Sequence, residues 1–469
     1  MTHNRLLVLD VVGLTPRLLA HTPHLRAVAE SGWQAPLETV LPAVTCSVQS
    51  TFLTGKAPRD HGIVGNGWYF RDLGEIYLWR QHNRLVRGEK VWDTARRTVP
   101  GYRVANVCWW YAMGAATDWT VTPRPVYHAD GRKSPDCYTR PPALHDELTS
   151  SLGRFPLFQY WGPTASLRSS EWIIGAARRL LPRADLTLVY VPHLDYDLQR
   201  YGPDSPQAVT AARDVDRALA PLLDQARELG ARTLVVSEYG ITRASRPVHI
   251  NRALRKAKLL EVYTQEGMEY LDPWTSRAFA VADHQVAHVY VADPADIPAV
   301  ARLCADLPGV DLVLDREAQR EYGLDHERAG ELVLVAEPEA WFTYYYWRNN
   351  GHAPDFARGV EIHRKPGYDP AELFLDPADP NRAKLRAGLG LVRKKLGLRY
   401  AMDVVPLDGR WVRGTHGRLP DDERDGPVVL CDDPSTSRER MAAAQVRDLM
   451  LELAGLPEPQ SAETQKQEL

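Results

Sequence analysis

The chain has few cysteines and no long hydrophobic runs. Its five cysteines, among 469 residues, are odd in number, widely scattered and never in a CxxC pair, which argues against a disulfide framework or a thiolate zinc site. The apolar run near the N-terminus is short and stops at an aspartate, far below the length of a signal-peptide core or a membrane span. We therefore expect a cytoplasmic protein without a membrane partner.

An excess of one charge sign is also missing. The 57 basic and 60 acidic residues give a formal net charge of −3, so the composition shows no electrostatic footprint for nucleic acid. No nucleic-acid partner is expected. A phosphate-bearing ligand would have to be captured by a local site.

Short β-rich runs alternate with helix-like segments, and this order predicts an α/β fold with a mostly parallel sheet and helices on both faces. The carboxyl ends of such strands are where open α/β sheets bind ligands. The clearest strands are predicted at residues 6–9, 186–191, 233–236 and 288–291. The clearest helices are predicted at residues 205–229, 297–307 and 440–454.

Composition also divides the chain. Residues 322–403 are rich in aromatics, prolines and arginines, with four consecutive aromatic residues at 344–347. We interpret this segment as an insertion that caps a catalytic core made of residues 1–321 and 404–454. Residues 455–469 are polar, lack apolar periodicity and are predicted to be a disordered tail.

Two features near the N-terminus carry possible chemistry. Asp10 ends an apolar strand, where a carboxylate can face a cleft or bind a hard cation. Residues 42–69 are dense in hydroxyls, glycines and turn formers, which suits a strand-to-helix turn. Thr45 or Ser47 at this turn would lie beside a helix N-terminus, whose free N–H groups and dipole favour a phosphate group.

The order of these residues resembles a known family. Asp10, Thr45, Thr54–Gly55, His61–Gly62–Ile63 and Asn66 follow one another as in the type I phosphodiesterase and nucleotide pyrophosphatase branch of the alkaline phosphatase superfamily, which includes phosphonoacetate hydrolase. The resemblance implies an alkaline phosphatase-like three-layer sandwich. It also implies a metal-dependent hydrolase.

The resemblance assigns catalytic and substrate-binding roles. Thr45 would be the nucleophile, and its hydroxyl would need a cation because a threonine alkoxide is a poor species at neutral pH. Asn66 would donate its amide N–H to a phosphoryl oxygen together with the backbone N–H of Cys46. Trp68 is a candidate for substrate binding, although packing or a place in the cleft wall is the alternative.

Further along the chain, the resemblance places metal ligands with departures from the family pattern. Gln199 stands where the family has a histidine, and Glu238–Tyr239 stands where it has an Asp-His pair. The metal-binding candidates are Asp10, Thr45, Asp195, Gln199, Glu238, Tyr239 and His416. Because this set is rich in oxygen, we expect one or two divalent ions, with manganese, magnesium or calcium favoured over zinc.

Other side chains could replace the missing imidazoles. His193 and Asp197 would share a face with Asp195 if the preceding strand continues through them. Asp283–His284, beside an apolar strand, is a second candidate pair. Either pair could instead be structural, and His363 would face the substrate or pack with Tyr368.

Three functions are compatible with these residues. The leading one is hydrolysis of a phosphate diester, pyrophosphate or phosphonate through Thr45. The alternatives are a metal-dependent phosphomutase and a catalytically degenerate phosphoester-binding protein. The substrate is expected to be a small-molecule phosphoester or phosphonate, and nucleotide diesters, phospholipid headgroups and monoesters all remain open.

Overall fold

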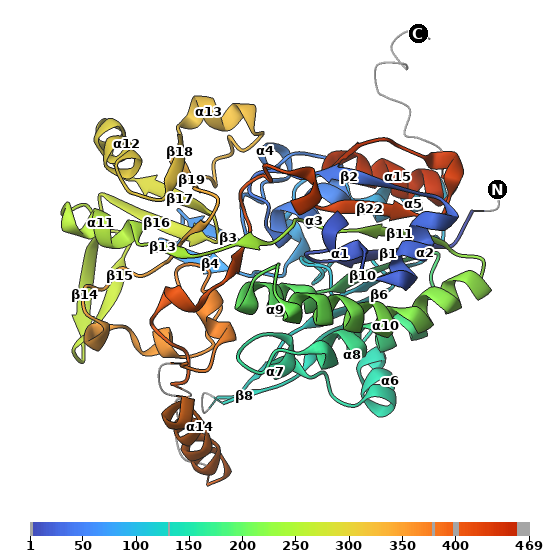
Figure 1. Ribbon diagram of the computed structural model, residues 1–469, viewed down its shortest axis with the longest axis horizontal. Helices are drawn as coiled ribbons and strands as arrows, with labels where there is room; N and C mark the ends of the chain where they lie inside the picture. The colour runs from blue at the N-terminus through green and yellow to red at the C-terminus, as the bar shows by residue number, and fades with distance from the viewer. Residues whose placement is uncertain (1–2, 130–131, 378–379, 397–402, 457–469) are drawn as a thin grey trace.

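A nine-stranded sheet forms the centre of the computed structural model, which describes residues 3–129, 132–377, 380–396 and 403–456 (Figure 1). Its strand order is β23-β2-β22-β11-β1-β10-β5-β6-β9. The five parallel strands in the middle are β11 (Arg232–Val236), β1 (Leu6–Val11), β10 (Leu186–Val191), β5 (Val104–Val107) and β6 (Trp119–Pro123). The flanking strands are β22 (Val428–Cys431), β2 (Trp33–Glu38), β23 (Met441–Ala442) and β9 (Cys137–Arg140).

The central strands are apolar on both faces. Every residue of β1 and β10 is buried, and their register pairs Leu6 with Leu186 and Asp10 with Tyr190. Continuous apolar runs are typical of parallel strands covered on both sides, because neither face meets water. The predicted mostly parallel sheet is therefore confirmed.

Helices cover both faces of this sheet, as Figure 1 shows. On one face lie α8 (Leu167–Leu180), α9 (His193–Tyr201) and α10 (Pro206–Glu228), and on the other α3 (Thr45–Thr54), α5 (Val91–Thr98) and α15 (Val446–Leu453). The start of α10 follows from its sequence: Ser205 caps the helix by accepting from the Ala208 N–H, and Pro206 occupies the first turn. The three-layer α/β fold agrees with the prediction.

A second, antiparallel sheet forms an accessory unit beside the main sheet (Figure 1). Its strands, in spatial order, are β16 (Ala278–Asp283), β17 (Val286–Val291), β19 (Leu332–Ala336) and β18 (Val310–Leu314). The helices α11 (Ile250–Lys256), α12 (Ile297–Ala305) and α13 (Arg316–Glu321) and the hairpin of β14 (Glu261–Gln265) and β15 (Met268–Asp272) belong to the same region.

This sheet departs from the sequence interpretation in two ways. The strand predicted at residues 288–291 lies here and not in the parallel sheet, because a short buried apolar run has the same composition in either setting. The predicted boundary at residue 322 falls between β18 and β19, which pair with each other. The accessory unit therefore begins well before the segment that we interpreted as an insertion.

The aromatic segment that follows is packed and not exposed. Tyr344, Tyr345, Tyr346 and Trp347 are all buried in the core of the accessory unit. Nearby, buried Lys365 pairs with Asp369 at 2.7 Å and with Glu372 at 2.8 Å. Figure 1 then shows α14 (Pro380–Lys395) projecting from the lower edge of the molecule.

The C-terminal tail is predicted to begin at residue 455, and all of it after Leu456 lies outside the described residues. Within the described ranges, no helix is long and apolar enough to cross a bilayer.

Candidate active site

Three neighbouring parallel strands bring acidic side chains to one edge of the main sheet. Asp10 lies near the end of β1, in register with Val236 on β11. Glu238 follows the end of β11, and Asp195 lies in the first turn of α9, which follows β10. Because the carboxyl ends of parallel strands meet at one edge, carboxylates far apart in sequence face the same region.

Thr45 is the first residue of α3, so the predicted turn from a strand into a helix is confirmed. Its side chain is buried but lines a pocket of 1640 Å³. The Oγ1 atom lies 3.1 Å from the hydroxyl of Tyr239. The hydroxyl therefore lies at a helix N-terminus, a position that favours anions.

Gln49 connects Asp10 and Glu238. It lies one turn after Thr45 on α3, and its Nε2 donates to Asp10 Oδ2 at 3.0 Å and to Glu238 Oε1 at 2.7 Å. Its Oε1 accepts from the Trp110 backbone N–H at 2.7 Å, which fixes the orientation of the amide. Asp10 Oδ1 and Glu238 Oε2 are buried and have no hydrogen-bond partner.

Gln49 was not among the sequence candidates. The signal available for it was its spacing of four residues from Thr45 within a predicted helical stretch, since side chains at that spacing share a helix face.

Burial controls the charge of this carboxylate pair. It raises the pKa of Asp10 from 3.8 to about 7, against hydrogen bonds from Glu238 and Gln49 that lower it. Burial, and then the charge of Asp10, raise the pKa of Glu238 well above its usual range. Two adjacent carboxylates out of water need a proton or a cation between them. The pair is therefore suited to hold a positive charge.

Asp195 and His416 form the second half of the site. His416 Nε2 lies 3.9 Å from Asp195 Oδ1, which has no hydrogen-bond partner. His416 Nδ1 lies 2.8 Å from the Ala43 carbonyl, so Nδ1 donates and Nε2 keeps a lone pair. Burial lowers the pKa of His416 well below its usual value and raises that of Asp195 to about 7. The neutral imidazole is the form that binds metal.

Four aromatic rings in contact cross the site. The centroids of Tyr239 and His416 are 3.6 Å apart, those of His416 and His284 are 3.7 Å apart, and those of His284 and Tyr368 are 3.6 Å apart. His284 Nδ1 lies 2.8 Å from Asp283 Oδ1, and its Nε2 is buried without a partner. Its φ of 59° is rare outside glycine, and such strain is common at functional sites. Asp283–His284 is thus the alternative pair that the fold brings to this site.

The site offers buried donor atoms of the kinds that bind a divalent cation, although no three of its carboxylate and imidazole donors lie within 4.8 Å of one another in the described chain. Asp10 Oδ1, Glu238 Oε2 and Asp195 Oδ1 are buried oxygens without partners, and His416 Nε2 carries a free lone pair. Oxygen-rich sets suit manganese, magnesium or calcium. Gln49 donates to the second oxygen of Asp10 and of Glu238, and the Ala43 carbonyl accepts from the second ring nitrogen of His416. Hydrogen bonds of this kind commonly orient metal ligands.

Asn66 and Cys46 are arranged differently from the sequence interpretation. The Cys46 N–H donates to Asn66 Oδ1 at 3.0 Å, so it does not point freely at a phosphoryl oxygen. The side-chain and backbone N–H groups of Asn66 donate to the two oxygens of Asp283, at 3.1 Å and 2.8 Å. In this structure Asn66 joins the start of α3 to Asp283.

Trp68 is not among the residues that line this pocket, and its assignment to substrate binding stays a prediction. It is 2% exposed and lies in a separate hydrophobic cluster, stacked on Phe70 at 4.9 Å with the Arg328 guanidinium 4.8 Å from its ring. These surroundings are the ones that the alternative interpretation, packing, predicts.

The suggestion that His193 and Asp197 share a strand face with Asp195 is wrong, because the strand does not continue through them. His193 begins helix α9, so the chain does not continue as a strand and the alternation with Asp195 and Asp197 is absent. Helical spacing instead places Asp195 and Gln199 on one face. Gln199 Oε1 accepts from the Tyr368 hydroxyl at 3.2 Å. His363 lines the pocket, with Nδ1 3.3 Å from the Leu78 carbonyl.

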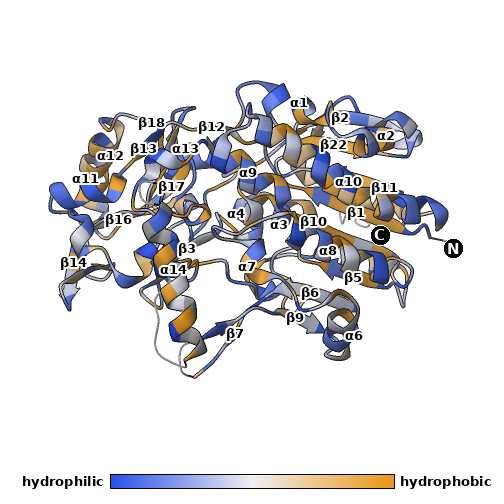
Figure 2. Ribbon diagram, turned by 60° about the horizontal axis from the view of Figure 1, so that its bottom comes forward, coloured by the Kyte–Doolittle hydropathy of each residue, from blue (hydrophilic) through white to orange (hydrophobic). Residues whose placement is uncertain are grey.

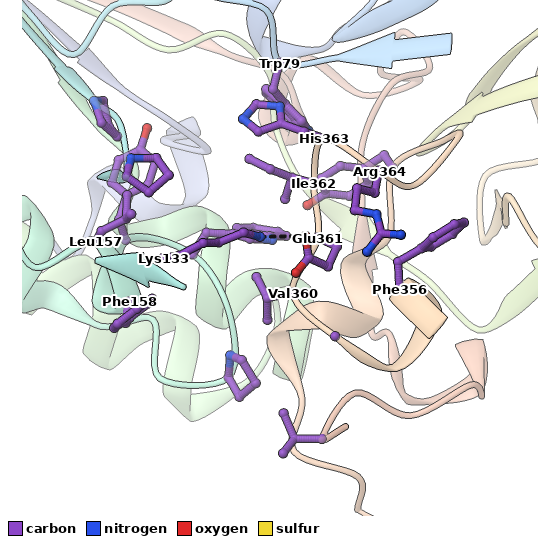
Figure 3. Close-up of a pocket in the computed structure, with 18 of the residues that line it drawn as sticks. Trp79, Lys133, Leu157, Phe158, Phe356, Val360, Glu361, Ile362, His363 and Arg364 are labelled. Atoms are coloured by element: carbon purple, nitrogen blue, oxygen red, sulfur yellow. Dashed lines mark hydrogen bonds and ion pairs between the residues drawn. The ribbon is translucent and has the colours of Figure 1, made fainter. Parts of the chain in front are cut away.

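The pocket has a volume of 1640 Å³. The candidate residues that line it are Thr45, Asp195, Tyr239, His284 and His416. Aromatic side chains make up much of the remaining wall, including Trp79, Trp110, Phe158, Trp161, Phe356 and Tyr368. Figure 3 shows Lys133 reaching Glu361 across this space, with Nζ and Oε2 2.5 Å apart.

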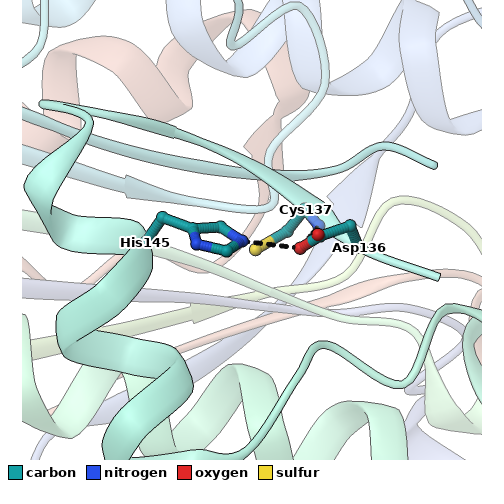
Figure 4. A group of neighbouring side chains, drawn as sticks. All are labelled: Asp136, Cys137 and His145. Atoms are coloured by element: carbon teal, nitrogen blue, oxygen red, sulfur yellow. Dashed lines mark hydrogen bonds and ion pairs between the residues drawn. The ribbon is translucent and has the colours of Figure 1, made fainter. Parts of the chain in front are cut away.

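One tight group of potential metal ligands lies elsewhere on the described chain. The ligand atoms of Asp136, Cys137 and His145 all lie within 4.8 Å of one another at the β9 edge of the main sheet (Figure 4). His145 Nε2 is already paired with Asp136 Oδ1 at 2.7 Å, and none of the three lines the pocket. This group is an ion pair beside a buried thiol.

Comparisons with known proteins agree with the fold. Phosphonoacetate hydrolase from Sinorhizobium meliloti 1021, in complex with phosphonoacetate, superposes with a TM-score of 0.62 at 18% identity, covering 96% of each chain. Murine ectonucleotide pyrophosphatase/phosphodiesterase 5, in complex with AMP, gives 0.56 at 16% identity, covering 97% of this chain and 96% of that one.

Sequence comparisons identify the family. An uncharacterized pyrophosphatase/phosphodiesterase of Schizosaccharomyces pombe is 23% identical over 280 residues, which are 55% of this chain and 47% of that protein. The match thus spans about half of the relative's length. Residues 6–369 match the family described as type I phosphodiesterase/nucleotide pyrophosphatase. The chain therefore belongs to the type I phosphodiesterase/nucleotide pyrophosphatase family of hydrolases.

Proposed function

We propose that the protein is a metal-dependent hydrolase that cleaves a phosphate diester, pyrophosphate or phosphonate with Thr45 as its nucleophile. The observation that carries this proposal is the position of the Thr45 hydroxyl. It lies at the N-terminus of α3 and lines the pocket, and its oxygen is hydrogen-bonded to the Tyr239 hydroxyl oxygen at 3.1 Å. The buried Asp10–Glu238 pair is joined to the same helix through Gln49.

The chemistry follows two displacements at phosphorus. Thr45 Oγ1 forms a bond to phosphorus and loses its proton, while the bond to the leaving group breaks and that group departs with the electron pair. Water then attacks phosphorus, the bond to Oγ1 breaks, and Thr45 regains a proton. Tyr239 holds the hydroxyl before attack, and the positive end of the α3 dipole favours the charge that gathers on the phosphoryl oxygens.

Asp10, Glu238 and Thr45 would hold one divalent ion, and Asp195, His416 and Gln199 would hold a second. A bound cation lowers the pKa of a coordinated hydroxyl and neutralises charge on the reacting oxygens. Gln49 fixes two of the carboxylates, and the Ala43 carbonyl fixes the His416 tautomer. These residues thus prepare the site independently of the ion.

The family match favours hydrolysis over the phosphomutase alternative. Two structural neighbours are described with phosphonoacetate and AMP, so phosphonates and nucleotide esters are the first substrates to test.

A second candidate, a phosphoester-binding protein without turnover, is favoured by one observation. Where the family resemblance expects two imidazoles, Tyr239 hydrogen-bonds Thr45 and Gln199 accepts from Tyr368. Neither side chain is as good a cation ligand as imidazole.

Chromogenic substrates separate the two candidates. The chelated protein would be reloaded with manganese and assayed on bis-p-nitrophenyl phosphate and p-nitrophenyl phenylphosphonate, alongside Thr45→Ala and the control Ser50→Ala. Ser50 is buried on the same helix and its hydroxyl bonds only the Cys46 carbonyl. Turnover in the wild type and Ser50→Ala, but not in Thr45→Ala, supports the hydrolase. Substrate binding without turnover in all three supports the binding protein.

A further inference from the structure

Exposed apolar side chains gather on one side of the molecule. Most of the large hydrophobic residues that are exposed in the described chain belong to β7 (Val126–Tyr127), α7 (Leu157–Tyr160) and the region of α14. We call them the mouth surface: Val126, Tyr127, Phe158, Leu385, Leu389, Val392 and Leu396. Contiguous exposed apolar groups mark interaction sites, because leaving them in water costs free energy.

Within the mouth surface, α14 carries a regular apolar stripe. Leu385, Leu389, Val392 and Leu396 are 63%, 55%, 55% and 68% exposed. Their spacing of four, three and four residues places them on one helical face. No other part of the described chain covers this face, although a helix in water normally turns such a stripe inward.

The charge of α14 indicates what covers the stripe. The segment from Pro380 to Lys395 contains six lysines and arginines and no aspartate or glutamate. Lys384 and Arg393 are exposed beside the stripe. A basic amphipathic helix of this kind binds the interface of an anionic bilayer, with its apolar face among the acyl chains and its cations at the headgroups.

The mouth surface adjoins the pocket. Tyr127 and Phe158 line the pocket, as do Leu375 and Val404, the residues on either side of the α14 region. Figures 1 and 2 both place α14 beside the hairpin of β7 and β8 (Lys133–Ser134). A bilayer that contacts α14 would therefore lie against the opening that leads to Thr45.

The pocket wall has the character that an apolar substrate group requires. Trp79, Trp110, Trp161 and Phe356 line it, while Lys133 is paired with Glu361 and Arg364 with Asp355. Its 1640 Å³ exceeds the roughly 300–1,000 Å³ typical of small-ligand sites. The aromatic part of this wall offers apolar surface that an apolar chain can contact.

We propose that the mouth surface docks the protein on an anionic membrane, where the pocket receives a phosphoester or phosphonate that carries an apolar chain. The identity of the substrate rests on the proposed hydrolase function, whereas docking does not. Docking by a basic interfacial helix is compatible with the absence of a spanning helix in the described residues.

Vesicle binding tests docking without any turnover. The full chain would be sedimented with vesicles of phosphatidylcholine alone and with 30% phosphatidylglycerol added, alongside the double variant Leu385→Ser/Leu389→Ser. Leu73→Ser is the matched control, because Leu73 is an equally exposed leucine (59%) outside the mouth surface. Thr45→Ala would be included to show that binding does not depend on catalysis.

We expect the wild type, Thr45→Ala and Leu73→Ser to bind the anionic vesicles and to release them at high salt. The double variant should bind roughly tenfold more weakly, since its stripe has lost apolar area. Equal binding of the double variant and the wild type would overturn docking by α14. Light scattering gives a second outcome that would overturn it. In that outcome the wild type is a dimer, and the double variant is a monomer that binds vesicles as well as the wild type does.

A substrate series tests the second half of the proposal. The wild type would be assayed on p-nitrophenyl methyl, hexyl and decyl phosphates below their micelle concentrations. We expect kcat/KM to rise roughly a hundredfold or more along the series. Equal values would overturn the apolar substrate while leaving hydrolysis by Thr45 intact. No turnover of any ester would contradict the proposed function and not the docking.

Discussion

The side-chain amide of Gln49 donates to Glu238 Oε1 at 2.7 Å, and the same nitrogen donates to Asp10 Oδ2 at 3.0 Å. One amide thus binds one oxygen of each carboxylate, and the other oxygens, Asp10 Oδ1 and Glu238 Oε2, have no hydrogen-bond partner. The two free oxygens are the ones available to a cation beside Thr45. Gln49 is therefore a positioning residue for the carboxylate pair.

Gln49→Met, which keeps the side-chain volume and removes the amide, should weaken manganese affinity by about 10–100-fold. Calorimetric titration of the chelated protein measures this affinity directly. Ser50→Ala, on the same helix but away from the carboxylates, should bind manganese as the wild type does. Tighter binding by Gln49→Met would mean that the amide competes with the cation and does not orient its ligands.

The stability of the chelated protein should depend on pH through Asp10. Its pKa in the folded state is about 7, above the ordinary value of 3.8, so the folded state binds the proton more tightly. The free energy of unfolding should therefore be highest below about pH 4 and should fall as the pH rises to about 7. Asp10→Asn should flatten this dependence. Urea denaturation at pH 5 and 7.5, in EDTA, measures it, and identical slopes in both proteins would contradict the assignment.

The donor set should favour manganese over zinc. Three buried carboxylates and the Thr45 hydroxyl are oxygen donors, while His416 is the single imidazole that the family pattern supplies. Hard divalent cations prefer oxygen ligands. Activity of the chelated protein, titrated with each metal, should return with manganese. Full recovery with zinc and none with manganese would refute this ranking.

Asn66→Ala should act mainly on stability. Removing its amide leaves the buried Cys46 N–H without an acceptor and removes one of the two donors to Asp283 Oδ1, which keeps His284 Nδ1. An unpaired buried group costs about 1–3 kcal/mol of unfolding free energy. Thr45→Ala removes a small side chain and should change stability little. Urea denaturation distinguishes the two, and equal stability of Asn66→Ala and wild type would argue against the structural role.

The local features of the site could be predicted from the sequence. An aspartate that ends an apolar run, and a threonine ahead of a helical stretch, are local patterns, and the structure places Asp10 and Thr45 accordingly. The parallel strands beside Asp10 were likewise recognisable, because strands buried on both faces are apolar throughout.

Contacts between residues far apart in the chain could not be predicted from the sequence. Gln49 lies between Asp10 and Glu238, and His284 packs against His416, only because distant strands pair as they do. Residues 288–291 look like any buried strand, and only the hairpin with β16 puts them in an antiparallel sheet. Asn66 matched a family position, yet its bonds to Asp283 come from a segment more than two hundred residues away.

The central claim, that Thr45 attacks phosphorus, is tested most directly by trapping the covalent intermediate. The manganese-loaded protein would be mixed with p-nitrophenyl phenylphosphonate, quenched in acid within milliseconds and analysed by peptide mass spectrometry. The account predicts a phenylphosphonyl group on the peptide containing Thr45 in the wild type and none in Thr45→Ala. Turnover by the wild type with no adduct on this peptide, together with full activity of Thr45→Ala, would contradict it.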